Sequence, residues 1–280
     1  GESSWGAKAL GKFKRIVLMD QRGTGTSTPV TKQTLQTRFP DLFVLDSKDS
    51  DASLDELASK FPEEYGRFKK SLKEATNYMT KFRADSIVQD AEYLREALML
   101  PKEPGSDPPR PRPWGAALGQ SFGGFCMMTY LSFVDHPPRI CLFTGGIAPM
   151  LTPAYKAYSK LWERVRERSL MYYDMYPGDV ALVKRIVRVL LDNPAELPSG
   201  GRLTARRFLQ YGLALGGSPS SFASMHSLFS SAFVNSESSE LNRSFVKQFD
   251  FEQPFDDYPI YYWMHESIYG DGPDNSPTNW

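Results

Sequence analysis

The sequence has few of the residues that mark several large protein classes. Its 280 residues include only two cysteines, Cys126 and Cys141, and both stand in apolar runs. We therefore expect buried, reduced thiols rather than a disulfide or a metal-binding pair. Three histidines occur, none beside a cysteine at ligand spacing, so no metal site is predicted. Basic and acidic residues number 33 each, which leaves no overall basic field to favour nucleic acid as a partner.

Long apolar runs are also missing. No stretch approaches the roughly 20 apolar residues that cross a bilayer, so no membrane partner is expected. The first residues lack the charged-then-apolar pattern of a signal peptide, and a cytoplasmic location is the default expectation. The length suits one large domain or a domain with a lid, and small molecules are the expected partners.

The most informative stretch that is present reads Gly-Gln-Ser-Phe-Gly-Gly, at residues 119–124. It lies between an apolar run at 114–118, expected to be extended, and a helix-like run at 125–133. A strand, a sharp turn and a helix are the context of a nucleophile elbow. Glycines two positions before and after the serine let the backbone turn without Cβ clashes. Ser121 is therefore the candidate nucleophile, and an ordinary glycine-rich turn is the alternative.

A second glycine-rich turn lies upstream, at residues 20–29, and reads Asp-Gln-Arg-Gly-Thr-Gly-Thr-Ser-Thr-Pro. It ends an apolar run at 15–20 that we predict to be a buried parallel strand. Together with the elbow, this motif resembles the proline iminopeptidase family of α/β-hydrolases, especially its longer bacterial and fungal branch. The likeness continues at 200–208, 215–218 and 265–269, which resemble the cap domain of that branch.

The pattern of the first half predicts an α/β core over residues 1–148. An amphipathic helix at 85–100, the elbow strand with its helix, and a further strand at 139–143 follow the 15–20 strand. The resulting order of strands and helices is that of a doubly wound, mostly parallel sheet. Resemblance to the family identifies this sheet as an incomplete α/β-hydrolase core.

Two inserted segments interrupt the predicted core. Residues 46–81 contain a capping box, Ser53 with Glu56, and then apolar residues at helical spacing, so we expect a helical insertion. Residues 101–113 hold six prolines and are expected to form an exposed, mostly extended loop. A proline-rich ligand for a peptide-recognition domain is the alternative for that loop.

From residue 149 onward the pattern is helical. Helical runs are predicted at 154–176, 179–191, 204–215, 222–234, 241–249 and 259–269. In an α/β-hydrolase, a helical segment inserted after the strand that follows the elbow covers the active site. We therefore expect residues 149–280 to form an all-helical cap domain.

The resemblance implies a serine aminopeptidase that releases N-terminal proline from peptides through an acyl-enzyme, with no cofactor. Ser121 would attack the carbonyl carbon, and the backbone N–H of Phe122 would help to hold the oxyanion. Gln120, Gly123 and Gly124 would line the substrate site beside the nucleophile. A general esterase or amidase with the same elbow is the competing enzyme.

Glu266 is the second residue to which the resemblance gives a role. It stands in a run rich in tyrosine and tryptophan, where a buried acid needs a partner. The likeness implies that this partner is the α-ammonium group of the substrate. A solvated or arginine-paired glutamate is the alternative.

The sequence offers no suitable residues for the other catalytic roles, which are the triad Asp and His and the second oxyanion donor. The triad order in α/β-hydrolases is Ser, Asp, His, and the last two follow the cap. His136 stands in a turn before the cap, His226 lies mid-helix as an expected surface or packing residue, and His265 lies within the cap, so none suits the role of base. The family's Gly-Gly-Pro-Gly turn, which completes the oxyanion hole, is not found before residue 15.

We therefore expect the triad Asp and His to lie outside this chain, as they would if it were truncated at both ends. A fragment of an active enzyme is the preferred interpretation. The alternative is a catalytically inactive, truncated hydrolase that acts as a binding protein.

Overall fold

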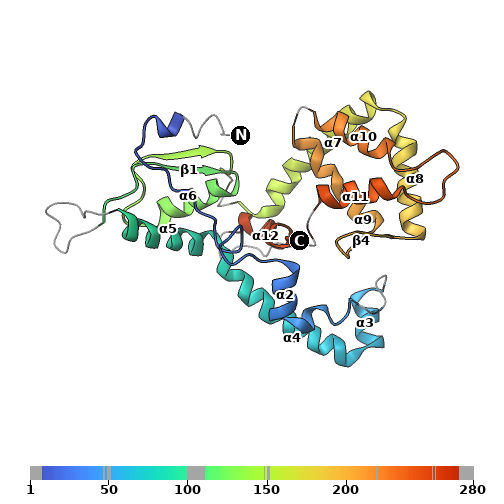
Figure 1. Ribbon diagram of the computed structural model, residues 1–280, viewed down its shortest axis with the longest axis horizontal. Coiled ribbons are helices and arrows are strands. Elements are labelled where there is room, and N and C mark those ends of the chain that lie inside the picture. The colour runs from blue at the N-terminus through green and yellow to red at the C-terminus, as the bar shows by residue number, and fades with distance from the viewer. Residues whose placement is uncertain are drawn as a thin grey trace. The chain divides into compact units, whose positions relative to one another are not determined.

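The computed structural model describes residues 8–46, 48, 52–99, 111–147, 149, 152–218, 220–253, 255 and 257–270. The chain forms two compact units (Figure 1). Unit 1 comprises Gly1–Val30 and Gln36–Ala148, and unit 2 comprises Thr31–Leu35 and Pro149–Trp280. Most of the predicted proline-rich loop at 101–113 lies outside the described residues; its last three residues carry no helix or strand.

Unit 1 contains a parallel two-stranded sheet. Strand β1 (Ala117–Gln120) pairs with β2 (Cys141–Thr144), and Leu118 lies opposite Leu142. Helix α6 (Phe122–Phe133) packs against both strands, and α5 (Ala84–Leu98) packs against α6; in the view of Figure 1 both helices lie below the strands. The predicted elbow strand and the strand near 139–143 are confirmed, each ending one or two residues later than predicted.

One face of this sheet is covered and the other is open. A small apolar cluster of Ile87, Val88, Cys126 and Tyr130 joins α5 to α6. Side chains alternate along each strand, and Leu118 and Leu142, paired in register, are 38% and 50% exposed. Parallel sheets normally bury both faces, so the described part of unit 1 holds a small core for a sheet of this kind.

The strand predicted at 15–20 is wrong, because these residues carry neither helix nor strand. No backbone hydrogen bond joins them to another described residue. An apolar run becomes a strand only when a neighbouring strand satisfies its N–H and C=O groups, and no described segment does so here. Leu18 is consequently 80% exposed.

The segment at 46–81 is helical where it is described. It contains α3 (Leu54–Lys60) and α4 (Pro62–Met79), followed by the 3-10 turn η2 (Thr80–Phe82). The capping box is confirmed: the hydroxyl of Ser53 accepts the N–H of Glu56, and the Glu56 carboxylate accepts the N–H of Ser53 at 2.7 Å. Upstream lie α2 (Lys32–Arg38) and η1 (Pro40–Phe43), and η1 packs on α4.

Unit 2 is a helical bundle around an aromatic core. Its elements are α7 (Ala154–Met175), α8 (Asp179–Asp192), α9 (Ala205–Gln210), η3 (Tyr211–Gly216), α10 (Ser221–Ser230), α11 (Arg243–Glu252), α12 (Ile260–Met264) and η4 (Glu266–Tyr269). Figure 1 shows α7 to α11, in yellow to orange-red, as one group. Tyr172, Phe208, Phe245 and Phe249 are almost fully buried at its centre, so apolar burial holds this unit together.

The prediction that residues 149–280 are all helical is wrong at one point. Strands β3 (Ala195–Glu196) and β4 (Arg202–Leu203) form a short antiparallel pair. The turn between them passes through Gly200 at φ +84°, a conformation that glycine adopts without steric cost. Leu203 is fully buried, so this pair anchors the turn to the core of unit 2.

Candidate active site

Ser121 occupies the sharp turn between β1 and α6. Its φ of 52° and ψ of −118° lie in a region that non-glycine residues rarely adopt, which is the backbone strain expected of a nucleophile elbow. The Ser121 N–H donates to the carbonyl of Thr144 on β2 at 3.3 Å, and the Gly124 N–H donates to the Ser121 carbonyl at 2.8 Å. The backbone therefore holds the residue from both sides, and its side chain is exposed.

Close backbone approach around Ser121 requires glycine at three positions. A Cβ at Gly119 would overlap the carbonyl oxygen of Gly123, and one at Gly124 would overlap the carbonyl oxygen of Gly145. At Gly146, where φ is +75°, a Cβ would overlap the Ser121 carbonyl oxygen. Sequence reasoning missed the two glycines after β2, although a Gly-Gly pair directly after a strand was a usable signal.

Gly123 does not have the steric role that the sequence suggested. A Cβ at this position would meet no atom within 4 Å, so the turn itself does not need glycine there. The clash-free turn depends instead on Gly119 before the serine and on Gly124 three residues after it. Gln120, the last residue of β1, is exposed next to Ser121.

The Phe122 N–H lies at the first position of α6, directly after Ser121. Phe122 is the first residue of α6, so its N–H has no acceptor within the helix, and it donates to no other described residue. A helix N-terminus also carries a partial positive charge that favours an anion. One backbone donor is thus available beside the serine hydroxyl, and an oxyanion hole normally uses two.

The described residues provide no base for Ser121, whose hydroxyl forms no hydrogen bond with any of them. His136 stands in a turn after α6 and is exposed. In unit 2, His226 places Nδ1 3.0 Å from the Asp179 carboxylate and stacks on the ring of Tyr176 at 4.1 Å. That environment agrees with the packing role expected of His226.

Asp20 organises the glycine-rich turn upstream. Its carboxylate accepts the backbone N–H of Thr26 at 3.0 Å and the Thr26 hydroxyl at 3.1 Å, and these hydrogen bonds hold the pKa of Asp20 below its usual value. A Cβ at Gly25, where φ is +52°, would overlap that carboxylate. Arg22 then fastens the turn to α5 through two hydrogen bonds to Asp90, at 2.6 and 2.5 Å.

A buried charge cluster, not predicted from the sequence, ties α5 to α6. Glu92 pairs with Arg95 at 2.6 Å and accepts the hydroxyl of Tyr130 on α6. Arg95, 4% exposed, also donates to the carbonyl of Pro111 at 2.9 Å, shortly before β1. The (i, i+3) spacing of Glu92 and Arg95 was the available signal, but it usually marks an exposed pair. This cluster fixes the helix that begins at the elbow.

Glu266 lies in unit 2, in the turn that follows α12, and is 7% exposed. Burial raises the pKa of Tyr158 on α7 to about 12, and the nearby charges of Tyr269, Glu266 and Tyr261 add to that rise. The ring of Tyr158 lies 5.8 Å from that of Tyr269, edge to face. The carboxylate therefore has aromatic neighbours and little contact with water.

His265 precedes Glu266 and is part of the same aromatic surroundings. Its ring centroid lies 5.0 Å from that of Tyr261 and 6.2 Å from that of Tyr269. Burial lowers the pKa of His265, because desolvation disfavours the charged imidazolium. Burial therefore favours the neutral imidazole of this histidine.

Both cysteines are free thiols, as expected, but only Cys126 is buried, while Cys141 is half-buried. Burial raises the pKa of Cys126 to about 12, so it is no nucleophile at neutral pH. In the part of the chain that the structure describes, no three His, Cys, Asp or Glu side chains are grouped as metal ligands. No helix within the described ranges is both long and apolar enough to cross a bilayer.

A parallel strand, a serine at positive φ and a helix that starts at the next residue define the nucleophile turn of an α/β-hydrolase. The sequence is 33% identical over 268 residues, 96% of this chain, to a proline iminopeptidase of Aeromonas sobria. It is 31% identical over 215 residues, 77% of this chain, to the proline iminopeptidase aneH of Aspergillus aculeatus. The chain belongs to the proline iminopeptidase family.

The chain spans 52% of the length of the Aeromonas relative and 40% of the Aspergillus relative. No family model matches it. Similarity to these two proteins implies an α/β-hydrolase fold, and the parallel pair β1–β2 with α6 beside it is compatible with that fold.

Proposed function

We propose that this chain supplies the nucleophile and the amino-group-binding carboxylate of a serine aminopeptidase that releases N-terminal proline from peptides. The observation that carries the proposal is the turn at Ser121, with an exposed hydroxyl beside the available N–H of Phe122. Two relatives named proline iminopeptidase support the choice of substrate. In this proposal, residues 1–148 belong to a doubly wound hydrolase core and residues 149–280 to a cap over it.

The reaction proceeds through an acyl-enzyme. The Ser121 hydroxyl loses its proton to a base as its oxygen attacks the carbonyl carbon of the N-terminal proline, and the Phe122 N–H stabilises the resulting oxyanion. The scissile C–N bond then breaks, its nitrogen takes up the proton, and the shortened peptide leaves. Water hydrolyses the proline ester on Ser121. The base and its orienting acid are a His and an Asp that the reaction requires and that we assign to no described residue.

Glu266 provides the preference for a free N-terminus. An N-terminal proline carries a secondary ammonium group, and a poorly solvated carboxylate binds such a cation more strongly than an exposed one does. The aromatic rings around Glu266 add a favourable surface for a cationic pyrrolidine ring. Internal proline residues carry no charge and gain nothing from this contact, so cleavage is restricted to the first residue.

Hydrolysis of a proline anilide and of a neutral acetate ester tests the proposal, measured on a protein that contains this chain together with the Asp and His that the proposal requires, and on its Ser121→Ala and Glu266→Gln variants. Ser121→Ala should abolish both reactions. Glu266→Gln should lower kcat/KM for the anilide by about a hundredfold, the effect of losing a charged hydrogen bond worth about 3 kcal/mol, and change ester hydrolysis less than about twofold. If Glu266→Gln lowered the hydrolysis of both substrates equally, or of neither, the result would instead identify a general esterase or amidase.

One observation favours a second candidate, a binding protein built on an inactive hydrolase. The Ser121 hydroxyl forms no hydrogen bond to a histidine among the described residues, so activation of the serine depends on groups outside them. This candidate predicts a cooperatively folded chain that hydrolyses neither substrate and stays unmodified at Ser121 by an uncharged phosphonate.

A further inference from the structure

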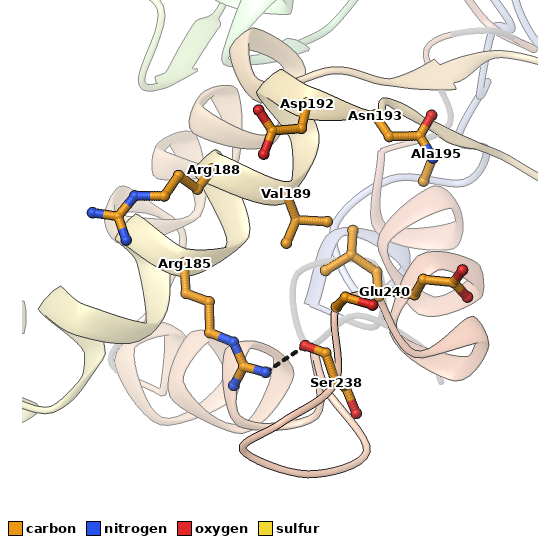
Figure 2. A pocket seen from close by; sticks show the side chains of 10 residues that line it. Arg185, Arg188, Val189, Asp192, Asn193, Ala195, Ser238 and Glu240 are labelled. Carbon is orange, nitrogen blue, oxygen red and sulfur yellow. Dashed lines mark hydrogen bonds between the residues drawn. The ribbon is translucent and has the colours of Figure 1, made fainter.

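Helix α8 differs at its two ends. Its second half borders a surface groove, where the carboxylates of Asp192 and Glu240 lie on opposite sides of Val189 (Figure 2). The Arg188 guanidinium is turned away from them, so these exposed charges do not meet at one point. The first residue of the helix, Asp179, is by contrast only 3% exposed, and polar groups of two other helices converge on it.

Tyr172 and His226 are the side chains that contact the Asp179 carboxylate. The Tyr172 hydroxyl, on α7, donates a hydrogen bond to Oδ2. Nδ1 of His226, on α10, lies 3.0 Å from both carboxylate oxygens. Within the described part of the chain no lysine or arginine pairs with Asp179, so the imidazole is the one partner there that can carry a positive charge.

These contacts determine which ring nitrogen of His226 carries the hydrogen. Burial, together with the hydrogen bond to Asp179, raises the pKa of Tyr172, so its hydroxyl stays protonated and acts as the donor. An ionised carboxylate only accepts hydrogen bonds, so Nδ1 carries the hydrogen in the neutral ring and Nε2 has a free electron pair. A carboxylate that holds one ring nitrogen in this way makes the other a stronger electron-pair donor.

The ring of His226 is fixed in position and still accessible. One face stacks on Tyr176, with the ring centroids 4.1 Å apart and the planes 8° from parallel. The Nδ1 edge faces Asp179, yet 41% of the His226 side chain is exposed. This exposure comes from the open face and the remaining edge of the ring, to which Nε2 belongs. Asp179 and the Tyr176 ring would both stabilise a positive charge that forms on the imidazole during attack.

Other nucleophiles of the described residues are less reactive at neutral pH. Burial raises the pKa of the Cys126 thiol to about 12 and also raises that of the Cys141 thiol, so neither is a thiolate. Lysine amines are protonated at this pH and have no free electron pair. An oriented, accessible imidazole is therefore the strongest uncharged nucleophile of this part of the chain.

We propose that His226 is a modification site for small neutral electrophiles of the α,β-unsaturated aldehyde class. Nε2 forms a bond to the β-carbon, the carbon–carbon double bond becomes single, and the α-carbon takes a proton from water. The hydroxide left behind removes the Nδ1 proton, so the adduct is neutral and no oxidant or reductant takes part. A neutral reagent suits the site, because the Asp179 carboxylate would repel an anion. The proposal does not depend on the reaction at Ser121.

Incubation of the full chain with trans-2-hexenal, followed by borohydride reduction and peptide mass spectrometry, tests the site. The reaction is run at about pH 8, where an ordinary imidazole is neutral. His226 should be modified about tenfold faster than His136, a more exposed histidine that serves as the reference within the same molecule. Asp179→Asn should slow modification of His226 about tenfold or more and leave that of His136 unchanged. The matched control, Tyr172→Phe, keeps the carboxylate and should change the rate at His226 less than about threefold.

The unfolded chain gives a second comparison, which decides the question even if Asp179→Asn does not fold. In concentrated urea the contact with Asp179 is lost, so His226 and His136 should react at equal rates. Ser121→Ala should leave both rates unchanged, which separates this site from the proposed reaction. Equal rates at the two histidines in the folded chain, a rate ratio that persists in urea or in folded Asp179→Asn, or modification of Cys141 before His226 would each overturn the proposal.

Discussion

The described apolar cores of the two units differ in size. Unit 2 is built on one large apolar cluster, in which Phe245 and Phe249 are completely buried. Among the described residues of unit 1, a cluster of four buried residues lies beside the sheet, and further apolar residues, among them Phe39, Met79 and Phe82, are buried around η1, α4 and η2, while β1–β2 exposes Leu118 and Leu142. Hydrogen-bonded ion pairs also stabilise its turns, and one example is Arg22 with Asp90. The unit with the candidate nucleophile is therefore the one with the smaller described core.

The difference in core size affects how the Ser121 turn is held. A strained turn such as that at Ser121 persists only where surrounding contacts determine it, and here those contacts are backbone close approaches rather than side-chain packing. Substitutions of core residues in unit 2 should act through lost apolar burial, whereas substitutions at the Ser121 turn and the 20–29 turn of unit 1 should act through steric overlap and lost charge contacts.

The largest effect is expected from Phe245→Ala. Removing a fully buried ring from the unit 2 cluster should cost about 3–5 kcal/mol of unfolding free energy, through lost transfer energy and the cavity left behind. Hydrogen exchange should accelerate across unit 2 and stay unchanged in β1 and α6. Phe251→Ala is the matched control, since that ring is 84% exposed, and should change stability by less than about 0.5 kcal/mol.

Gly119→Ala should cause the next largest loss of unfolding free energy. The added Cβ overlaps the Gly123 carbonyl, so the elbow must shift, at a cost of about 1–3 kcal/mol. Gly123→Ala, in open space within α6, should be neutral or stabilise the helix by up to about 1 kcal/mol. Urea unfolding followed by exchange of the β1 and α6 amides measures both. Equal effects of the two substitutions would show that close approach does not shape this turn.

Arg22→Ala should have a smaller effect. The bidentate pair with Asp90 is about one third exposed at both side chains, so its loss should cost about 1 kcal/mol. Exchange should quicken around the 20–29 turn. For comparison, Arg67→Ala removes a single, more exposed contact to Asp41 and should cost less than about 0.5 kcal/mol.

The smallest effect is a pH dependence at Asp20. Its pKa is lowered in the folded chain by the Thr26 N–H and hydroxyl, so its stabilising contribution is present above the unfolded pKa and disappears as the pH falls through the folded value. The difference in melting temperature between the original chain and Asp20→Asn should therefore be constant from pH 7 to about 4 and shrink below that. A difference that grows on acidification would contradict the assignment.

The sequence predicted the elements that depend on local pattern. The elbow serine, the capping box of Ser53 and the long helices of unit 2 follow from glycine placement, capping chemistry and helical periodicity. The 15–20 strand was wrong, because pairing depends on a neighbour that a local pattern does not reveal. The β3–β4 pair was missed because two-residue strands have no period to detect.

For the candidate site, too, the sequence predicted the contiguous motifs and missed the contacts between distant segments. Ser121 and Phe122 were predicted because the motif is contiguous, and Glu266 because the family resemblance gives a role to this acid in an aromatic run; their roles stay predictions. Two features join segments that are far apart in the sequence. One is the close backbone approach of Gly145 and Gly146 to the Ser121 turn, and the other is the charge cluster of Glu92, Arg95 and Tyr130. Such contacts were visible only in the folded chain.

The most direct test of the account is the site of covalent modification by an uncharged fluorophosphonate, located by mass spectrometry on a folded protein that contains this chain together with the Asp and His that the proposal requires. The account predicts modification at Ser121, lost in Ser121→Ala and retained in Glu266→Gln, because the proposed role of Glu266 is to bind the ammonium group of a substrate, which this reagent lacks. A folded protein of this kind that remains unmodified at Ser121, or is modified to the same extent at other exposed serines, would contradict the claim that this turn presents a nucleophile.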